Sequence, residues 1–272
     1  MQLPPVAGVI GWPVAHSKSP VIHRFWLVEA GIDGDYSRFP VAPAHLQAFA
    51  RALPAMGMRG VNVTVPHKLA VMAHLDEVDS LAATVGAVNT VVVDEGGRLL
   101  GTNTDVEGVE GPCRARGVAG GEAWVIGSGG AARAAAAAAV RLGCRVRLLA
   151  RDTDKAAAML AGMGIAGAVS ALAAPLPAAG EVRLLFNATS LGMKGKPGLE
   201  LDLSSLPGGC VVFDAVYAPL ETGLLRAARA RGLPVIDGLE MLVGQAARAF
   251  ELFYGVPAPR AGDARLRHLL LA

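Results

Sequence analysis

The sequence predicts an α/β protein that contains mostly parallel sheets. The first observation is that short apolar runs typical of buried strands alternate with helical segments along the 272 residues. Such an order favours parallel pairing through helical crossovers. The second observation is a glycine-rich turn, "VIGSGGAA", that lies between a predicted strand and a predicted helix. A chain of this length can bury the cores of two modest domains or of one large domain.

The composition excludes several classes of protein. The chain is 53% hydrophobic and 18% charged, so we expect a sizeable core and no extensive disorder. A net charge of +2 gives no reason to expect a nucleic-acid partner. Cys113, Cys144 and Cys210 have no metal-binding spacing, and we expect reduced thiols in a cytoplasmic protein. Neither a signal peptide nor a membrane span is expected.

The first hundred residues alternate between predicted strands and helices. The segment 19–31 has apolar residues at helical spacing, and Gly31 is a stop signal, which predicts a helix. A hairpin within 87–105 turns at Glu95-Gly96-Gly97. The other expected elements are strands over 6–11, 34–41 and 59–67, and helices over 44–57, 68–75 and 79–86.

From Asp105 onward the pattern changes to repeated β/α units. A connecting helix begins near Asp105, and Gly111-Pro112 predicts that it is shortened or kinked. A strand, the glycine-rich turn, a helix and a second strand follow within 122–151. Further strands are expected within 182–189, 210–217 and 234–238, and helices over 224–232 and 239–255. The tail, residues 256–272, is either a helix docked on the first domain or a contact for a partner.

The glycine-rich turn matches the G-x-G-x-x-G/A fingerprint of dinucleotide-binding folds. Gly127 permits the tight turn, Gly129 lets a pyrophosphate approach the backbone, and Ala132 lets the helix pack close to the strand. The N-terminus of the helix then offers free N–H groups to phosphate. A glycine-rich turn without a ligand is the alternative, and the flanking strands and helix favour the nucleotide site.

Charged residues after the second strand indicate which dinucleotide binds. That strand ends at Ala150, where an NAD site would place Asp or Glu against the ribose. Arg151 and Lys155 suit a 2′-phosphate instead, which favours NADP, unless both are ordinary solvated charges. Asp152 complicates this interpretation, because it could neutralise Arg151 or contact the ribose itself.

Two serines precede a helix that starts with proline. At the N-terminus of that helix, Ser17 and Ser19 could bind a carboxylate with help from the helix dipole. Ser19 would equally serve as an ordinary N-cap. We assign the nearby imidazoles of His16 and His67 structural hydrogen bonds rather than a catalytic step.

Further polar residues lie near the ends of predicted strands in the first half. Asn62 and Thr64 share one face of the strand expected over 59–67, Asn89 lies near a strand start and Asp105 follows a strand. Each alone suits a turn or cap, and Lys68 alone suits the solvated surface. Together they supply amide, hydroxyl, ammonium and carboxylate groups where open α/β sheets bind ligands.

A set of motifs extends along the chain in a fixed order: "GWPVAHSKSPVIH", "GVNVTVPHK", "GAVNTV", "GTNTD", "GSGGAARA", "NATSLGM", "DAVYAP" and "GLEMLVGQA". With this set the chain resembles the shikimate dehydrogenase (shikimate 5-dehydrogenase) family over nearly its whole length. The set and its order are specific, whereas single pieces such as the glycine-rich turn are not.

The resemblance implies the interconversion of 3-dehydroshikimate and shikimate with NADPH and NADP, in the shikimate pathway of aromatic amino acid biosynthesis. It implies that Lys68 and Asp105 are the catalytic pair. The implied substrate-binding residues are Ser17, Ser19, Asn62, Thr64, Asn89, Tyr217 and Gln245. The implied cofactor-binding residues are Gly127, Ser128, Gly129, Gly130, Ala131, Arg151, Lys155, Thr189, Ser190, Val216, Gly238 and Met241.

The implied chemistry agrees with these residue types. Hydride transfer to a ketone builds negative charge on its oxygen, which a cationic Lys68 can stabilise and protonate. Asp105 can orient Lys68 and bond a neighbouring hydroxyl. Because the cofactor carries the redox step, no metal is expected.

We expect two domains with the substrate in the cleft between them. The N-terminal α/β substrate domain would comprise 1–105 plus 239–272, and a Rossmann-like dinucleotide-binding domain, 106–238, would be inserted into it. Three positions depart from the family's usual residues. Arg24 replaces Asn, Ala150-Arg151-Asp152 replaces Asn-Arg-Thr, and Gly108-Val109 replaces Gly-Phe. The second departure weakens the case for NADP.

Two other functions stay open at this stage. A quinate/shikimate dehydrogenase using NAD(P) would act on a substrate that differs in ring unsaturation and one hydroxyl. A non-catalytic nucleotide-binding protein could use the same scaffold, but it would have no reason to combine Lys68 and Asp105 with the paired serines. The oligomeric state is not readable from the sequence, and a homodimer is one option.

Overall fold

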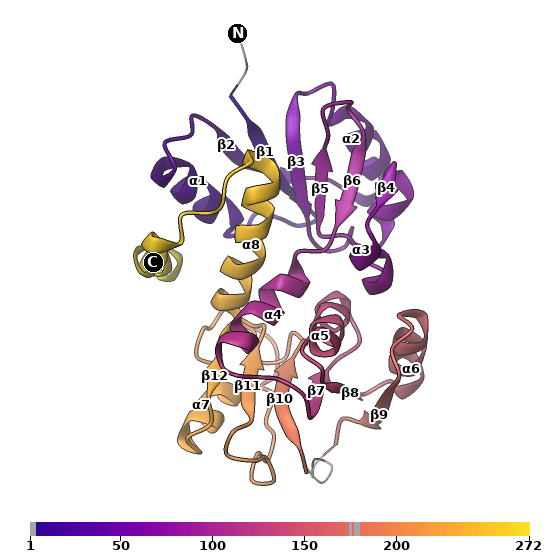
Figure 1. The fold of residues 1–272 in the computed structure, drawn as a ribbon, viewed down its shortest axis with the longest axis vertical. Coiled ribbons are helices and arrows are strands. Elements are labelled where there is room, and N and C mark those ends of the chain that lie inside the picture. The colour runs from indigo at the N-terminus through magenta and orange to yellow at the C-terminus, as the bar shows by residue number, and fades with distance from the viewer. Residues whose placement is uncertain (1–3, 174–175, 177–179) are drawn as a thin grey trace. The chain divides into compact units, whose positions relative to one another are not determined.

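The protein consists of two compact units, described here from a computed structural model that covers residues 4–173, 176 and 180–272. The discontinuous unit comprises Met1–Thr104 and Gln245–Ala272. The continuous unit comprises Asp105–Gly244. In Figure 1 the discontinuous unit is coloured indigo to purple with a yellow C-terminal part, and the continuous unit runs from magenta to orange.

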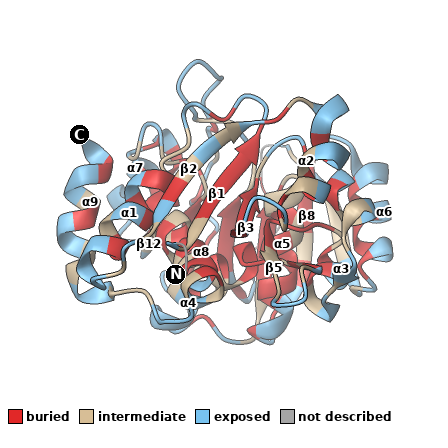
Figure 2. Ribbon diagram, turned by 90° about the horizontal axis from the view of Figure 1, so that it is seen from above, coloured by how far each residue is buried: buried red, intermediate tan, exposed pale blue. Residues whose placement is uncertain are grey.

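The discontinuous unit contains a mixed six-stranded sheet in the order β2-β1-β3-β5-β6-β4. The strands β1, β2 and β3 pair in parallel, β5 is antiparallel to both β3 and β6, and β4 pairs in parallel with β6. Their bounds are β1 Val6–Gly11, β2 Asp35–Pro40, β3 Met58–Val63, β4 Glu77–Val78, β5 Thr90–Val93 and β6 Leu99–Thr102. The buried residues of β1 and β3 form a red band in Figure 2.

Helices complete the discontinuous unit and include residues from both ends of the chain. They are α1 Ser19–Glu29, α2 Leu46–Ala52, α3 Ser80–Val85, the later part of α8 Gly238–Tyr254, and α9 Asp263–Leu271, with short 3₁₀ turns at Pro43–His45, Ala70–His74 and Arg260–Gly262. Phe253 of α8 packs with Ala7, Val9 and Tyr36 in the core. A Cβ at Gly60 would lie 2.7 Å from the Phe253 ring and 2.2 Å from the carbonyl oxygen of Val91, so only glycine fits there.

The continuous unit contains a parallel six-stranded sheet in the order β12-β11-β10-β7-β8-β9. Counted along the chain within this unit, the order is that of the doubly wound nucleotide-binding fold, in which the first strand lies at the centre. The strands are β7 Glu122–Ile126, β8 Arg145–Ala150, β9 Gly167–Ala171, β10 Val182–Asn187, β11 Val211–Asp214 and β12 Val235–Ile236. The neighbours of β7 are β8 and β10, so the topological switch point lies at the carboxyl end of β7.

The helices of the continuous unit are α4 Asp105–Ala115, α5 Gly130–Arg141, α6 Thr153–Gly162, α7 Gly223–Ala230 and the first part of α8. The alanine-rich α5 buries Ala132 and all of 134–139, because small side chains allow it to pack closely against α4, β7 and β8. Gly108 and Gly244 likewise allow α4 and α8 to approach, since a Cβ at Gly244 would lie 3.2 Å from the Gly108 Cα. No helix in the described part of the chain is both long and apolar enough to span a membrane.

The α/β fold with parallel sheets is confirmed, and the differences from prediction are local. The strand expected over 59–67 ends at Val63, and Pro66 has no N–H with which to extend the ladder. The helix expected over 44–57 stops at Ala52, shortly before Pro54. The helix α4 is not cut short at Pro112 but continues to Ala115. Residues 68–75 contain a 3₁₀ turn instead of an α-helix.

The tail forms the helix α9, which packs against α1 within the discontinuous unit. Of the two alternatives for residues 256–272, the docked helix is therefore confirmed.

Candidate active site

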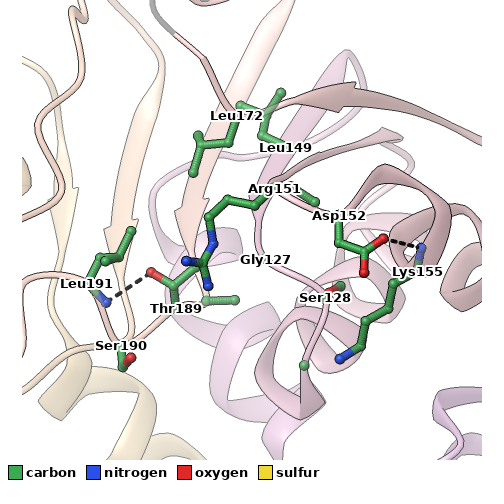
Figure 3. Close-up of a pocket in the computed structure, with 13 residues that line it drawn as sticks. Gly127, Ser128, Leu149, Arg151, Asp152, Lys155, Leu172, Thr189, Ser190 and Leu191 are labelled. Carbon is green, nitrogen blue, oxygen red and sulfur yellow. Dashed lines mark hydrogen bonds between the residues drawn. The ribbon is translucent and has the colours of Figure 1, made fainter.

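A cavity of about 510 Å³ opens in the continuous unit at the carboxyl ends of β7, β8 and β10 (Figure 3). This is the switch point, where doubly wound sheets bind their ligands. Its lining residues are Gly127, Ser128, Gly129, Leu149, Ala150, Arg151, Asp152, Lys155, Leu172, Ala188, Thr189, Ser190 and Leu191.

The glycine-rich turn forms one wall of this cavity. Gly127 has a φ of 114°, a conformation that favours glycine. A Cβ at Gly129 would meet nothing within 4 Å, so the space beside this residue is open to a ligand. The helix α5 begins at Gly130, and no side chain caps it within the described residues. Its first N–H groups are therefore available to a phosphate.

Two cations and one carboxylate follow β8 at the cavity. Asp152 is the N-cap of α6, and its side chain accepts a hydrogen bond of 2.9 Å from the backbone N–H of Lys155. This bond gives Asp152 a structural task that the sequence interpretation did not consider. Figure 3 shows this bond, together with the long side chains of Arg151 and Lys155 at the cavity.

A buried polar network fixes the opposite wall. Thr189 donates its backbone N–H and its hydroxyl to Asn187 Oδ1 at 3.0 and 2.7 Å. Asn187 in turn donates to Asp214, which also accepts from the Thr222 hydroxyl at 2.7 Å and from the backbone N–H of Val216 at 3.0 Å. Burial raises the pKa of the Asp214 carboxyl. The segment that lines the cavity is thus tied to two strand ends.

The structure brings together seven of the twelve predicted cofactor-binding residues on this cavity: Gly127, Ser128, Gly129, Arg151, Lys155, Thr189 and Ser190. The other five, Gly130, Ala131, Val216, Gly238 and Met241, are not among its lining residues. Gly238 has a packing role, because a Cβ there would lie 2.5 Å from the carbonyl oxygen of Ala215. Sequence reasoning missed the apolar walls Leu149, Leu172 and Leu191, and the supporting residues Asn187 and Asp214.

The paired serines lie at the start of α1 in the discontinuous unit. Their hydroxyl oxygens are 3.2 Å apart, and the backbone N–H of Ser19 donates to Ser17 Oγ at 3.3 Å. Lys18 occupies the N-cap position and Ser19 is the first helical residue, so the N-cap alternative for Ser19 is wrong. Nearby on α1, Arg24 forms an exposed salt bridge of 2.8 Å with Asp35.

Asn62 and Asn89 belong to one buried hydrogen-bond network. Tyr36 donates its hydroxyl to Asn62 Oδ1 at 2.7 Å, and Asn62 Nδ2 donates to Thr90 Oγ1 at 2.9 Å. Asn89 Oδ1 accepts from the backbone N–H of Thr104 at 2.7 Å. Sequence reasoning missed the partners Tyr36, Thr90 and Thr104, because they come from distant segments. The network gives both amides fixed orientations.

The segment after β3 contains Thr64, His67 and Lys68. Thr64 lies one residue beyond the end of β3 at Val63, and its backbone N–H still donates to the Ile10 carbonyl. His67 is 1% exposed, and its Nε2 lies 2.7 Å from the Val41 carbonyl oxygen, which gives this imidazole the structural bond expected of it. Lys68 is half-buried.

The remaining predicted residues are placed within their own units. In the continuous unit, Asp105 is 7% exposed at the start of α4, and Tyr217 follows β11 with its pKa raised by burial. In the discontinuous unit, Gln245 is 8% exposed on α8. Asp105 and Tyr217 are therefore shielded from bulk solvent more than ordinary surface residues are.

A doubly wound sheet, a glycine-rich turn at its switch point and a cationic cavity beside that turn define a dinucleotide-binding protein. Residues 9–91 match the family model for the shikimate dehydrogenase substrate binding domain, and residues 238–262 match that for the shikimate 5'-dehydrogenase C-terminal domain. The chain belongs to the shikimate dehydrogenase family.

Individual relatives support this membership over the full length. The chain is 51% identical to the shikimate dehydrogenase (NADP(+)) of Sphingopyxis alaskensis, over 98% of this chain and 97% of that protein. Among solved structures, a Thermus thermophilus shikimate 5-dehydrogenase in complex with NADP(H) and shikimate has a TM-score of 0.87 at 38% identity, with 97% and 99% of the two chains covered. A 5-ketofructose reductase of a Gluconobacter strain has a TM-score of 0.91 at 30% identity, with 99% and 100% covered.

Proposed function

We propose that this protein catalyses the reversible, NADPH-dependent reduction of 3-dehydroshikimate to shikimate, as an enzyme of the shikimate pathway. The observation that carries the proposal is the joint presence, in a member of this family, of a cationic nucleotide cavity and two serines at a helix N-terminus. The first feature suits a phosphorylated dinucleotide, and the second suits the carboxylate of the substrate.

NADP is the proposed cofactor, and the residues at the cavity fit it. Open space beside Gly129 leaves room for the pyrophosphate against the backbone. Arg151 and Lys155 would hold the 2′-phosphate, while Asp152 stays engaged at the N-terminus of α6. The other proposed contacts are Ser128, Gly130, Ala131, Thr189, Ser190, Val216, Gly238 and Met241. When bound, the reduced cofactor supplies the hydride.

Hydrogen bonds to the carboxylate and to the ring hydroxyls would hold the substrate. Ser17 and Ser19 would donate their hydroxyls to the carboxylate, with Tyr217 as a further donor. The proposed partners of the ring hydroxyls are Asn62, Thr64, Asn89 and Gln245. Since Asn62 and Asn89 are already fixed by internal bonds, little side-chain entropy would be lost when the substrate binds.

Lys68 and Asp105 are the proposed catalytic pair. As an ammonium group, Lys68 would stabilise the negative charge that develops on the ketone oxygen and would deliver a proton to it. In the reverse direction, neutral Lys68 would accept the proton of the alcohol. Asp105 would orient Lys68 and accept a hydrogen bond from the neighbouring hydroxyl.

A spectrophotometric assay tests the proposed reaction. Purified protein is incubated with NADP or NAD and with shikimate or quinate, and the formation of reduced cofactor is followed. The expected result is turnover of shikimate with NADP. Absence of shikimate turnover with both cofactors would remove the proposal, and faster turnover of quinate would replace it with a quinate dehydrogenase. Reduction of 5-ketofructose, tested in parallel, would indicate a site that does not need a carboxylate.

Substitution of Lys68 tests the catalytic assignment. Lys68→Ala should lower kcat by about two to four orders of magnitude, the usual contribution of a positioned acid–base group. Binding of NADPH, measured by its fluorescence, should stay unchanged. The matched control is Lys196→Ala, at an exposed lysine in a loop of the continuous unit. Near-normal turnover of Lys68→Ala would exclude this residue from proton transfer.

The proposed oligomeric state is a homodimer, and the proposed location is the cytoplasm. All three cysteines are free thiols, as expected in a reducing compartment. Light scattering would give the mass in solution, and a mass of a single chain would exclude the dimer.

A further inference from the structure

The C-terminal helix α9 is anchored on α1 by apolar and polar contacts. Leu266 and Leu270 are buried. Arg265 forms a salt bridge of 2.6 Å with Glu29 of α1, and its guanidinium lies 5.0 Å from the centre of the Phe25 ring. These contacts bring the C-terminal end of α9 to the segment that precedes α1.

Lys18 connects that segment to α9. Its ammonium group donates a hydrogen bond to the carbonyl oxygen of Leu270, in the last turn of α9. Carbonyls in the last turn of a helix have no partner within the helix and carry the negative end of its dipole. The charge of Lys18 therefore stabilises the C-terminus of α9. In the sequence, Lys18 lies between Ser17 and Ser19.

A second cation holds the same segment from β2. Arg38 donates from Nε to the Ser17 carbonyl oxygen at 2.9 Å. The segment that contains the paired serines is therefore held at two points: the Ser17 carbonyl binds a side chain from β2, and the Lys18 side chain binds a carbonyl of α9. The serine hydroxyls themselves take no part in these two bonds, so they stay oriented toward each other at 3.2 Å.

We propose that Lys18 is a positioning residue for the substrate carboxylate, and that α9 is therefore a structural part of the substrate site. The inference rests on the proposed function, in which Ser17 and Ser19 hold the carboxylate. Lys18 acts through the two serines: its ammonium group binds Leu270, and this bond fixes the spacing of the hydroxyls. Without the bond, the hydroxyls must be ordered by the substrate itself, at a cost in affinity.

Variants of the enzyme test the inference. Lys18→Met removes the ammonium group and keeps the length of the side chain. A chain that ends at Gly262 removes α9, and Arg265→Ala loosens α9 without shortening the chain. Lys196→Met is the control. The quantities to measure are KM for shikimate, kcat, and the Kd of NADPH from its fluorescence.

Lys18→Met should raise KM for shikimate about tenfold, the effect of one charge-assisted hydrogen bond, with kcat and the Kd of NADPH within about twofold of wild type. Lys18→Arg should restore most of the affinity, because it can reach the same carbonyl. The shortened chain should show the same rise in KM. The combination of both changes should be no worse than either alone, because both break the same bond.

Two results would overturn the inference. An unchanged KM in Lys18→Met would show that the segment needs no anchor. Additive effects of Lys18→Met and the truncation would show that Lys18 acts independently of α9. If the shortened chain does not fold, Arg265→Ala gives the same comparison with a smaller rise expected. Failure of the proposed function is distinguishable, since wild-type enzyme would then not turn over shikimate at all.

Discussion

Asn187 and Asp214 end the adjacent strands β10 and β11 as ladder partners, and Asn187 Nδ2 donates to Asp214 Oδ1 at 2.9 Å. Both side chains are fully buried. The hydrogen bond between their side chains therefore links the two strands at the point where the backbone hydrogen bonds of the sheet end. Because Asn187 also accepts from Thr189, the bond extends the rigidity of the sheet to the cavity wall.

Asp214→Asn should therefore weaken cofactor binding from a distance. The new amide group would face at least one of the donors Asn187, Val216 and Thr222, which leaves a buried donor unpaired. The expected loss is about 1–3 kcal/mol in the free energy of unfolding, together with a higher Kd for NADPH. Urea titration and NADPH fluorescence measure the two quantities. Asp202→Asn, at an exposed aspartate, is the control, and an equal effect there would contradict the prediction.

Gly129→Ala should weaken the binding of NADPH without lowering the stability of the folded protein. A Cβ at this position meets nothing within 4 Å, and φ is −95°, so the folded state should keep its stability. The methyl group would nevertheless occupy the space proposed for the pyrophosphate, so the Kd for NADPH should rise at least about tenfold. Gly162→Ala has equally open surroundings outside the cavity and should leave the Kd unchanged. Normal NADPH binding by Gly129→Ala would place the pyrophosphate elsewhere.

Arg151→Met should change the choice between NADP and NAD. Loss of a charge-assisted bond to the 2′-phosphate should lower kcat/KM for NADP about tenfold or more, with little change for NAD, which lacks that phosphate. The measurement is the ratio of kcat/KM for the two cofactors. If the ratio does not move, Arg151 is a solvated charge, and Lys155 becomes the residue to test next.

His23 should make stability depend on pH. Its ring stacks on Tyr36 at 4.0 Å, and within the described residues neither ring nitrogen has a hydrogen-bond partner. Burial lowers its pKa from 6.5 to about 3. As pH falls below 6.5, the unfolded chain binds a proton that the folded chain refuses, so stability is lost progressively toward pH 3.

His23→Phe should remove this dependence. Between pH 7 and pH 5 the wild-type protein should lose about 2 kcal/mol more than the variant in its free energy of unfolding. Urea titrations at both pH values make the comparison, and His45→Phe, outside this aromatic cluster and exposed, serves as the control. Parallel losses in wild type and His23→Phe would show that His23 is protonated in the folded state.

Local signals in the sequence predicted those parts of the fold that local forces decide. The turn at Gly127 and the helix after it depend on glycine conformation and alanine packing, and both appear where expected. The C-terminus of α3 at Gly86, with φ of 67°, is similar. Gly111-Pro112 was expected to shorten or kink α4, and the expected shortening is wrong, because the helix continues past Pro112 to Ala115. A single proline removes only one backbone hydrogen bond of the helix.

The supporting residues of the site could not be found in this way. Asn187 and Asp214 are 27 positions apart, and only the strand register makes them neighbours. Asp152 was read as a ligand for ribose or for Arg151, whereas its partner is a backbone N–H three residues on. Motif spacing identifies side chains that meet a ligand, but the bonds that orient them depend on tertiary structure.

The division of the chain into units has a consequence for synthesis. The continuous unit is one uninterrupted stretch, whereas the discontinuous unit needs Phe250 and Phe253 near the C-terminus to cover His23 and Tyr36 near the N-terminus. Ribosomes release a chain from its N-terminus, and domains generally fold as units. The second unit in sequence order is therefore the first that can finish folding. A nascent chain that extends to Gly244 contains the whole continuous unit, whereas the discontinuous unit still lacks the later part of α8 and α9.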